Sequence, residues 1–192
     1  PAHSLAGTLD IVPGQMDIVL NLDLHYFMEV AKQLAALSPE GRGVAPMIAS
    51  LPQRIGMTET ELWEMLTGQV VVALESTSVI PQLGGSQQKA TVLMMFGLKD
   101  TQKATQKLKS MPGHLDLKPD EDKGPHRIGP AAYCLIQKPE PYLVVALAPE
   151  ADKLLSSATG GEQSLAKTAL FKANPPDLKK PAPIFFYLDP QV

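Results

Sequence analysis

Little in this 192-residue chain marks a chemical site. Cys134 is its single cysteine, so no disulfide can form within the chain and cysteine usage does not reveal the redox compartment. Lys and Arg number 17 against 20 Asp and Glu, which leaves a formal net charge of −3. Because a nucleic-acid-binding surface normally carries a basic patch, this balance argues against a nucleic-acid partner.

Long apolar runs are also missing. The longest nearly continuous one, residues 142–148, is far shorter than the roughly 20 residues that span a bilayer, so no transmembrane helix is predicted. Charged residues make up 19% and hydrophobic residues 44%, which is typical of a folded domain rather than a disordered segment. We therefore expect residues 1–192 to form a single domain. Because the chain begins with Pro1 rather than Met, we expect it to be a fragment of a longer protein.

What the sequence does contain is a recurring unit, in which an apolar strand ends in a polar or Pro-Glu break and a helix follows. The pattern predicts this unit at residues 16–37, 91–111 and 142–158, and a further unit begins near residue 183. The last strand, 184–189, resembles the first one, 18–23. This similarity predicts an internal pseudo-repeat whose second part starts near Pro183.

Several strands are joined by hairpins rather than by helices. The expected pairs are Leu5–Val12 with Met16–Leu22, Gln69–Glu75 with Thr91–Leu98, and Ala131–Gln137 with Tyr142–Ala148. Direct hairpins make neighbouring strands antiparallel. The sequence therefore predicts an α+β fold with a mixed, mainly antiparallel sheet, helices packed on one face and repeated strand-helix units.

Helix boundaries are marked by short polar signals. Asp23 is placed to cap a helix that begins at Leu24, and Thr58 with Glu61 matches a capping box. Gly68 suits the left-handed position that ends a helix. Ser164 is a plausible N-cap for a short helix over residues 164–171.

Four segments resemble one bacterial family in the same order. They are Leu66–Leu74, Leu98–Asp100, Tyr142–Ala151 and Ser164–Phe171. The family is a domain of unknown function in envelope or secreted proteins, with a Leu-Gly-Gly-Glu-Val-Ala-Leu-like strand and a Ser-Leu-Ala-x-Ser-x-x-Phe-like helix. Here Thr67 and Gln69 replace the Gly and Glu of that strand, and Thr168 replaces the second Ser of that helix. The resemblance implies an extracytoplasmic location and further strand-helix units beyond this sequence, and it implies no activity or site residues.

A few side chains could carry catalysis, and each has a structural explanation beside the chemical one. Asp23 and Asp189 end similar strands and could act as the paired acids of a hydrolase, but helix capping accounts for both. His25 lies two residues after Asp23, a spacing at which helical side chains do not face each other. Cys134 lies within an apolar strand, which favours an inert buried thiol over a nucleophile.

A cluster of acids and histidines offers the only pattern suggestive of a metal site. His114 and His126 flank Asp116, Asp120 and Asp122, which could in principle hold a divalent cation. The spacing and glycine of an EF-hand loop are missing, so a solvated charged loop is favoured. The sequence predicts no metal and no cofactor.

Apolar side chains provide the remaining candidate site. Trp63, Met94 and Phe96 could line a cavity for an apolar ligand, although packing in the core explains them as well. Aromatic residues at 185–187 fall on both faces of the last strand, which predicts a central strand or one covered by a partner domain.

These observations favour a bacterial extracytoplasmic module that binds a partner or has a structural role, and that is not an enzyme. The expected partner is a neighbouring domain of the same parent chain or another protein. A second hypothesis is a carrier that holds a lipid or another apolar ligand between the sheet and its helices. A hydrolase using Asp23 or the histidine-acid loop is the third hypothesis.

Overall fold

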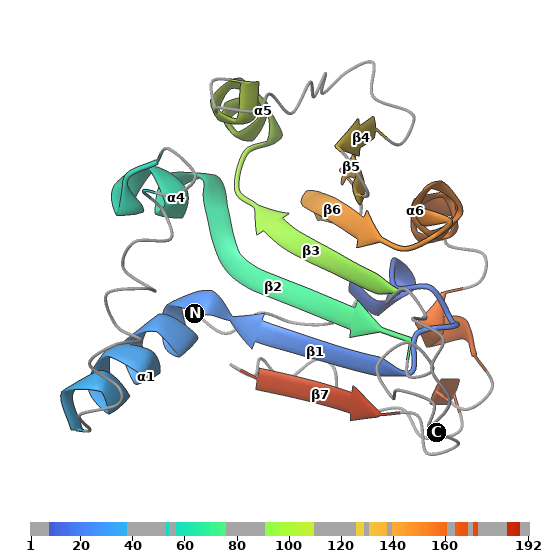
Figure 1. Ribbon diagram of the computed structural model, residues 1–192, viewed down its shortest axis with the longest axis horizontal. Helices are drawn as coiled ribbons and strands as arrows, with labels where there is room; N and C mark the ends of the chain where they lie inside the picture. The colour runs from blue at the N-terminus through green and yellow to red at the C-terminus, as the bar shows by residue number, and fades with distance from the viewer. Residues whose placement is uncertain are drawn as a thin grey trace.

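The computed structural model describes residues 8–37, 53, 57–75, 91–109, 126–128, 131–137, 140–160, 164–168, 171–172 and 184–188. Its centre is a seven-stranded sheet with the strand order β4-β5-β6-β3-β2-β1-β7 (Figure 1). The strands are β1 (Ile18–Asp23), β2 (Leu66–Leu74), β3 (Val92–Leu98), β4 (His126–Ile128), β5 (Ala131–Ile136), β6 (Tyr142–Leu147) and β7 (Ile184–Leu188). All six pairings are antiparallel, so the predicted α+β class and mainly antiparallel sheet are confirmed.

Helices follow three of these strands directly. The described α-helices are α1 (Leu24–Leu37), α4 (Glu59–Met65), α5 (Thr101–Lys109) and α6 (Ala151–Gly160), and the 3-10 helices are η1 (Thr8–Asp10) and η3 (Leu165–Lys167). β1 is followed by α1, β3 by α5 and β6 by α6, as the sequence pattern predicts. A structural pseudo-repeat between these units stays a prediction, and so does the placement of a second repeat near residue 183.

Two of the three expected hairpins are present. β2 pairs with β3, and β5 pairs with β6 with Ile136 opposite Tyr142. The first hairpin prediction is wrong for residues 8–12, where the chain forms η1 and a turn instead of a strand. The reason is tertiary: the Leu165 N–H donates to the Val12 carbonyl at 2.7 Å, and Leu9, Ile11 and Val12 are buried against the sheet.

Two of the predicted caps are made. The Asp23 Oδ1 atom accepts a hydrogen bond from the Tyr26 N–H at 3.1 Å, which confirms Asp23 as the cap of α1. At α4 the Thr58 hydroxyl accepts from the Glu61 N–H at 3.2 Å, and the Glu61 carboxylate accepts from the Thr58 N–H at 2.8 Å. This reciprocal pair is the predicted capping box.

Gly68 has the positive φ that its sequence position suggests, but for another reason. Its φ is +98°, and it lies inside β2 rather than after a helix, because α4 runs straight into β2 at Leu66. The β2–β3 register shifts between Leu66 and Val70, so Gly68 sits in a β-bulge. The predicted helix over 164–171 is interrupted: Leu165–Lys167 forms a 3-10 turn, Thr168 is extended, and residues 171–172 are helical again.

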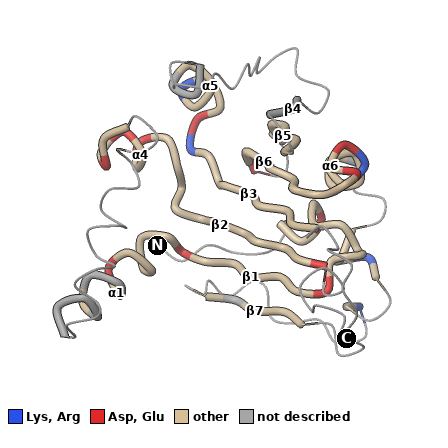
Figure 2. The backbone as a smooth tube through the Cα atoms, in the orientation of Figure 1, with Lys and Arg blue, Asp and Glu red and all other residues tan. Residues whose placement is uncertain are grey.

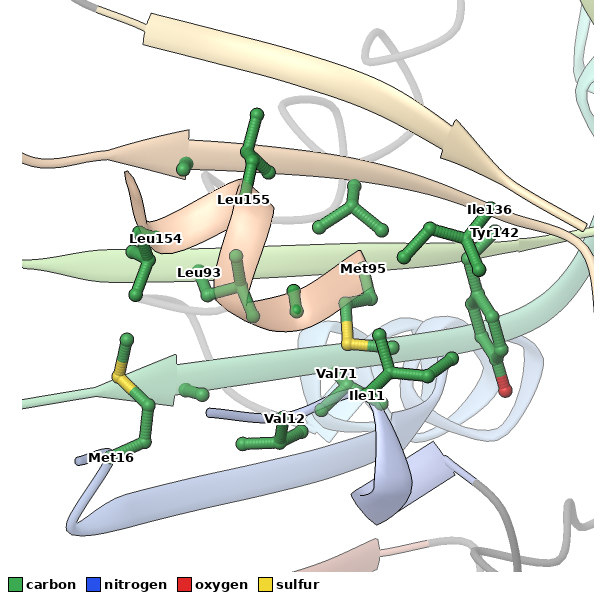
Figure 3. Packing of buried hydrophobic residues seen from close by; sticks show 14 of the residues in the cluster. Ile11, Val12, Met16, Val71, Leu93, Met95, Ile136, Tyr142, Leu154 and Leu155 are labelled. Carbon is green, nitrogen blue, oxygen red and sulfur yellow. The ribbon is translucent and has the colours of Figure 1, made fainter. Parts of the chain in front are cut away.

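The main core lies on one face of the sheet, which we call the inner face. Val71, Met95 and Val144 from the central strands pack against buried residues of α6, η1 and η3. In Figure 3 the side chains of Ile11 and Val12 lie over Val71, while Leu154 and Leu155 approach from α6. α6 contacts β5 and β6, so it covers one half of this face.

A smaller core cluster includes side chains from the other face. Leu62 and Met65 of α4 and Ala104 of α5 pack in this cluster with Tyr133 and Leu143 of the sheet. The helical cover is therefore divided, with α6 on the inner face and α4 and α5 at one end of the opposite face.

Candidate functional site

The face of the sheet opposite α6, which we call the outer face, is apolar on six adjacent strands. The strand register aligns its side chains in three rows that cross β7, β1, β2, β3, β6 and β5 in that order. The rows are Leu188-Ile18-Leu74-Val92-Leu147-Ala131, Phe186-Leu20-Val72-Met94-Val145-Tyr133 and Ile184-Leu22-Val70-Phe96-Leu143-Leu135. No Asp, Glu, Lys or Arg interrupts these rows, and Figure 2 shows the charged residues at strand ends and on helices.

Exposure of the outer face increases from β5 toward β7. Tyr133 and Leu135 on β5 are buried, while the outer-face residues of β1, β2 and β3 are half-buried. On β7 the exposed fractions reach 51% for Ile184, 59% for Phe186 and 48% for Leu188. The uncovered part of the outer face is therefore centred on β7.

Such a face is unusual for a sheet that meets water. Antiparallel sheets with one solvated face alternate apolar and polar residues along each strand. Here Ile18, Leu20 and Leu22 of β1 are apolar at the positions where that alternation would place polar residues. On β7, where Ile184, Phe186 and Leu188 are exposed, apolar surface of this kind marks an interaction site in many proteins.

The structure brings two of the three predicted site residues together. Met94 and Phe96 lie two positions apart on β3, and both side chains belong to the outer face. Trp63 lies on α4, where its ring packs on His25 with a centroid distance of 3.9 Å. Among the described contacts, Trp63 therefore belongs to a separate aromatic cluster at the end of the sheet.

That aromatic cluster is built around the bulge of β2. A Cβ atom at Gly68 would lie 2.5 Å from Cδ2 of His25, so the imidazole rests directly on the glycine backbone. The Trp63 indole N–H donates to Glu59 Oε1 at 3.3 Å, and the Lys99 ammonium donates to the Trp63 carbonyl. These contacts fix the junction of α1, α4 and β2 rather than open a ligand cavity.

The inner face contains a buried polar network that the sequence pattern does not reveal. The Tyr142 hydroxyl donates to Gln69 Oε1 at 2.8 Å and lies 2.9 Å from the Thr8 hydroxyl. The Gln69 amide donates to Asn21 Oδ1 at 3.0 Å. All four residues are buried, and they link η1, β1, β2 and β6.

The electrostatics of this network favour its neutral form. Burial raises the pKa of Tyr142 to about 12 from 10.0, since desolvation penalises the phenolate, and the Thr8 hydroxyl opposes the shift. A phenol that stays protonated here acts as a hydrogen-bond donor to Gln69. Because its partners are protein groups, the network cross-links the core.

A polar groove lies at the end of the sheet beside α6. Two adjoining clefts, each of about 300 Å³, share Gln15 and Ser157. The first is lined by Pro13, Gly14, Ser164, Lys167 and Thr168, and the second by Glu75, Thr91, Ala148, Pro149, Glu150, Lys153 and Leu154. Ser164 is buried, and its hydroxyl has no hydrogen-bond partner among the residues the structure describes.

The candidates for catalysis are dispersed. Asp23 is used as a cap, His25 stacks on Trp63, and Cys134 is buried in the inner core. His126 lies in β4, while His114, Asp116, Asp120, Asp122 and Asp189 fall outside the described residues. Within the part of the chain that the structure describes, no group of His, Cys, Asp or Glu is placed to hold a metal ion.

The sequence predicts Met94 and Phe96 as the lining of an apolar-ligand cavity, which stays a prediction, and it does not predict the outer face as a surface. Met94 and Phe96 were visible as large apolar residues, but the rows on β1, β2 and β6 appear only when the strands are aligned. The signal was present as alternation: Asn21 and Gln69 fall on the face of Val19 and Val71, which leaves only apolar residues on the other face.

No family model, curated protein or solved structure matches the chain. In the described segments, none of the helices has the length and apolar character needed to cross a membrane. The apolar outer face is consequently the feature on which a function can be argued.

Proposed function

We propose that this chain is a non-catalytic binding module whose outer face docks an apolar surface of a protein partner. The observation that carries the proposal is the set of three uncharged rows across six strands, with exposure highest on β7. Burying one large apolar side chain such as Phe186 contributes roughly 1.5 to 3 kcal/mol. A partner that covers this face therefore gains most where Ile184, Phe186 and Leu188 are exposed.

The shape of the surface favours a protein over a small ligand. Small-molecule sites enclose most of a ligand within a small cleft, whereas the outer-face rows extend across six strands, an extent that suits a protein surface. The two clefts at α6 are lined largely by polar residues, among them Gln15, Ser157 and Lys153. Uncharged apolar patches are typical of the core of a protein–protein interface.

The buried Tyr142 hydroxyl has a structural use rather than an open position in a cleft. Burial raises its pKa, and the hydroxyl is enclosed by Thr8 and Gln69. The family resemblance implies an extracytoplasmic location, and we include that location in the proposal. Fractionation of the producing cells tests it.

An apolar-ligand carrier is the second candidate. The observation in its favour is that Met94 and Phe96 share the outer face with half-buried Val70 and Val72. In that case a lipid, rather than a protein, would lie over β2 and β3. Native mass spectrometry of the freshly purified protein distinguishes the two, because a bound lipid adds its own mass to the chain.

Site-specific photo-crosslinking tests the protein-binding proposal. Benzoylphenylalanine replaces Met94 at the centre of the outer face, and Lys153 in the polar groove as the matched control. In extracts of the producing cells we expect a protein adduct from position 94 and not from position 153. Lipid adducts alone, or identical adducts from both positions, would overturn the proposal.

A purified partner then provides the quantitative test. Val72→Lys places a charge in the middle row, and we expect it to weaken binding at least tenfold, since an unpaired charge would be buried in an apolar interface. Lys153→Ala should leave the affinity unchanged. Cooperative unfolding of both variants must match that of the parent chain, and equal affinities would contradict the assignment of the outer face.

A further inference from the structure

β7 lies at one edge of the described sheet, so one side of its backbone faces away from the other described strands. It pairs with β1 along five residues, from Ile184 opposite Leu22 to Leu188 opposite Ile18. No other described strand pairs with β7. A strand at a sheet edge presents unpaired N–H and C=O groups on its outer side, and a further strand satisfies them.

The two edges of the sheet differ in how they are protected. The opposite edge, β4, spans three residues, one of which is Arg127, and short charged edges discourage pairing. β7 spans five residues, Ile184–Leu188, without a charge or a proline. Of the two edges in the described sheet, β7 is the one suited to pairing.

β7 is also held in place by the core. The Tyr187 ring packs edge-on against Phe171, which is buried, with a centroid distance of 5.6 Å. This contact anchors the strand from the inner face, while Phe186 points to the outer face beside Leu20. An ordered edge loses less conformational entropy on pairing than a frayed one.

Self-pairing of β7 is consistent with antiparallel symmetry and with the absence of charge on the strand. Residues directly opposite in an antiparallel pair point to the same face, so a two-fold axis perpendicular to the sheet at Phe186 keeps both outer faces on one side. Phe186 then lies beside its own symmetry mate, and Ile184 lies beside Leu188 of the second copy. Because these residues are uncharged, the symmetry places no like charges together.

We propose that a second copy of this chain pairs antiparallel with β7 and joins the two sheets into one. This proposal rests on the proposed function, because the joined outer faces form a single wider docking surface. The occupant is a second copy rather than a helix or a lipid, since neither of those can satisfy the edge backbone of β7. Pairing brings Ile184, Phe186 and Leu188, the most exposed part of the outer face, beside the same residues of the second copy and buries the sides that face them.

Sedimentation equilibrium over a range of protein concentrations tests the proposal. We expect the parent chain to form a species of twice the 20.7 kDa chain mass. Phe186→Lys should raise the dissociation constant of the dimer at least tenfold, because the symmetry would bring two ammonium groups together. Phe27→Lys is the matched control, since Phe27 is a 45% exposed aromatic on α1, and it should dimerise like the parent.

Disulfide cross-linking provides a second test that remains informative if the lysine variant misfolds. Phe186→Cys should give a disulfide-linked dimer on mild oxidation, whereas Phe27→Cys should remain largely monomeric, and the buried Cys134 is present in both. A parent chain that stays monomeric at about 100 µM would overturn the dimer, since it would place the dissociation constant well above that concentration. So would equal effects of the two lysine variants or equal cross-linking of the two cysteine variants.

The outcomes also separate this inference from the proposed function. A monomeric chain whose position 94 still crosslinks a different protein refutes the dimer and supports the outer face as a docking surface. A dimer that crosslinks nothing at position 94 supports self-pairing of β7 and refutes the docking of a further partner on the central strands.

Discussion

At the scale of single residues, Tyr142 couples ionisation to folding. Its hydroxyl donates to Gln69 inside the core, and burial raises its pKa to about 12, while an unfolded tyrosine titrates near 10.0. Between these two values the unfolded chain loses the proton and the folded chain keeps it. Stability is therefore fully present below pH 10 and falls as the pH rises toward 12, by roughly 2 to 3 kcal/mol.

Urea unfolding between pH 9 and pH 12 measures this loss. Tyr142→Phe should lack the Tyr142 part of the pH dependence, although it is less stable at pH 8 by about 1 to 3 kcal/mol because Gln69 and Thr8 lose their partner. Tyr26→Phe is the control, as Tyr26 is 48% exposed. Identical pH profiles for the parent and Tyr142→Phe would show that the hydroxyl ionises freely in the folded chain.

Gly68 illustrates how one residue joins two elements. At φ +98° a side chain is strained, and a Cβ atom would meet the His25 ring at 2.5 Å. We expect Gly68→Ala to destabilise the protein by about 1 to 3 kcal/mol, measured by thermal or urea unfolding. Adding His25→Ala removes the clash and should recover part of the loss, while the backbone strain remains.

If Gly68→Ala were neutral, the bulge would have relaxed and the His25–Trp63 stack would have moved. The chemical shifts of the Trp63 indole distinguish this outcome, because they report the ring current of the neighbouring imidazole.

At the scale of elements, the start of α4 shows what a complete cap contributes. Thr58→Ala removes one half of the capping box and leaves the Glu61 N–H without its acceptor. We expect a loss of about 1 kcal/mol in the free energy of unfolding. Ser164→Ala is the matched comparison, since Ser164 occupies the N-cap of η3 without a side-chain cap bond.

The expected difference between the two variants has a physical reason. The Ser164 hydroxyl is buried and has no hydrogen-bond partner among the described residues, so its removal should be neutral or stabilising. A loss at Ser164→Ala as large as that at Thr58→Ala would show that this hydroxyl is hydrogen-bonded in solution, for example to water in the adjoining groove.

The sequence predicts those caps and hairpins whose conformation depends on residues nearby in the chain. Asp23, the capping box at Thr58 and the hairpin of β5 with β6 depend on neighbours in sequence, and the sequence predicts all three. η1 was missed because contacts with η3 decide its conformation. The position of β7 at the sheet edge was likewise not predicted, since pairing with β1 joins segments far apart in sequence.

At the scale of the whole molecule, the sheet has two apolar faces and unequal cover. The inner face carries the main core with α6, and its buried polar groups are joined in the network around Tyr142. The outer face is buried only toward β5, where α4 and α5 contribute to the second cluster. Of the outer-face residues, the sequence predicts only Met94 and Phe96 as candidate site residues. The other residues of the surface are recognised only from the register between the strands.

Assembly through β7 makes thermal stability depend on protein concentration. A dimer that forms only between folded chains shifts the folding equilibrium by mass action, so the melting temperature should rise as the chain concentration is increased. Over a hundredfold range above the dissociation constant, the apparent stability per chain gains about 1 to 2 kcal/mol, or several degrees for a chain of this size. Differential scanning calorimetry measures this shift.

Phe186→Lys should weaken the concentration dependence while Phe27→Lys preserves it, because only the first residue lies on the edge strand. The quantity to compare is the change of melting temperature with chain concentration, and not the melting temperature itself. Any lysine substitution can change the intrinsic stability of the monomer. A flat dependence in the parent chain would contradict pairing through β7 and would leave the exposed row of Ile184, Phe186 and Leu188 to a different protein.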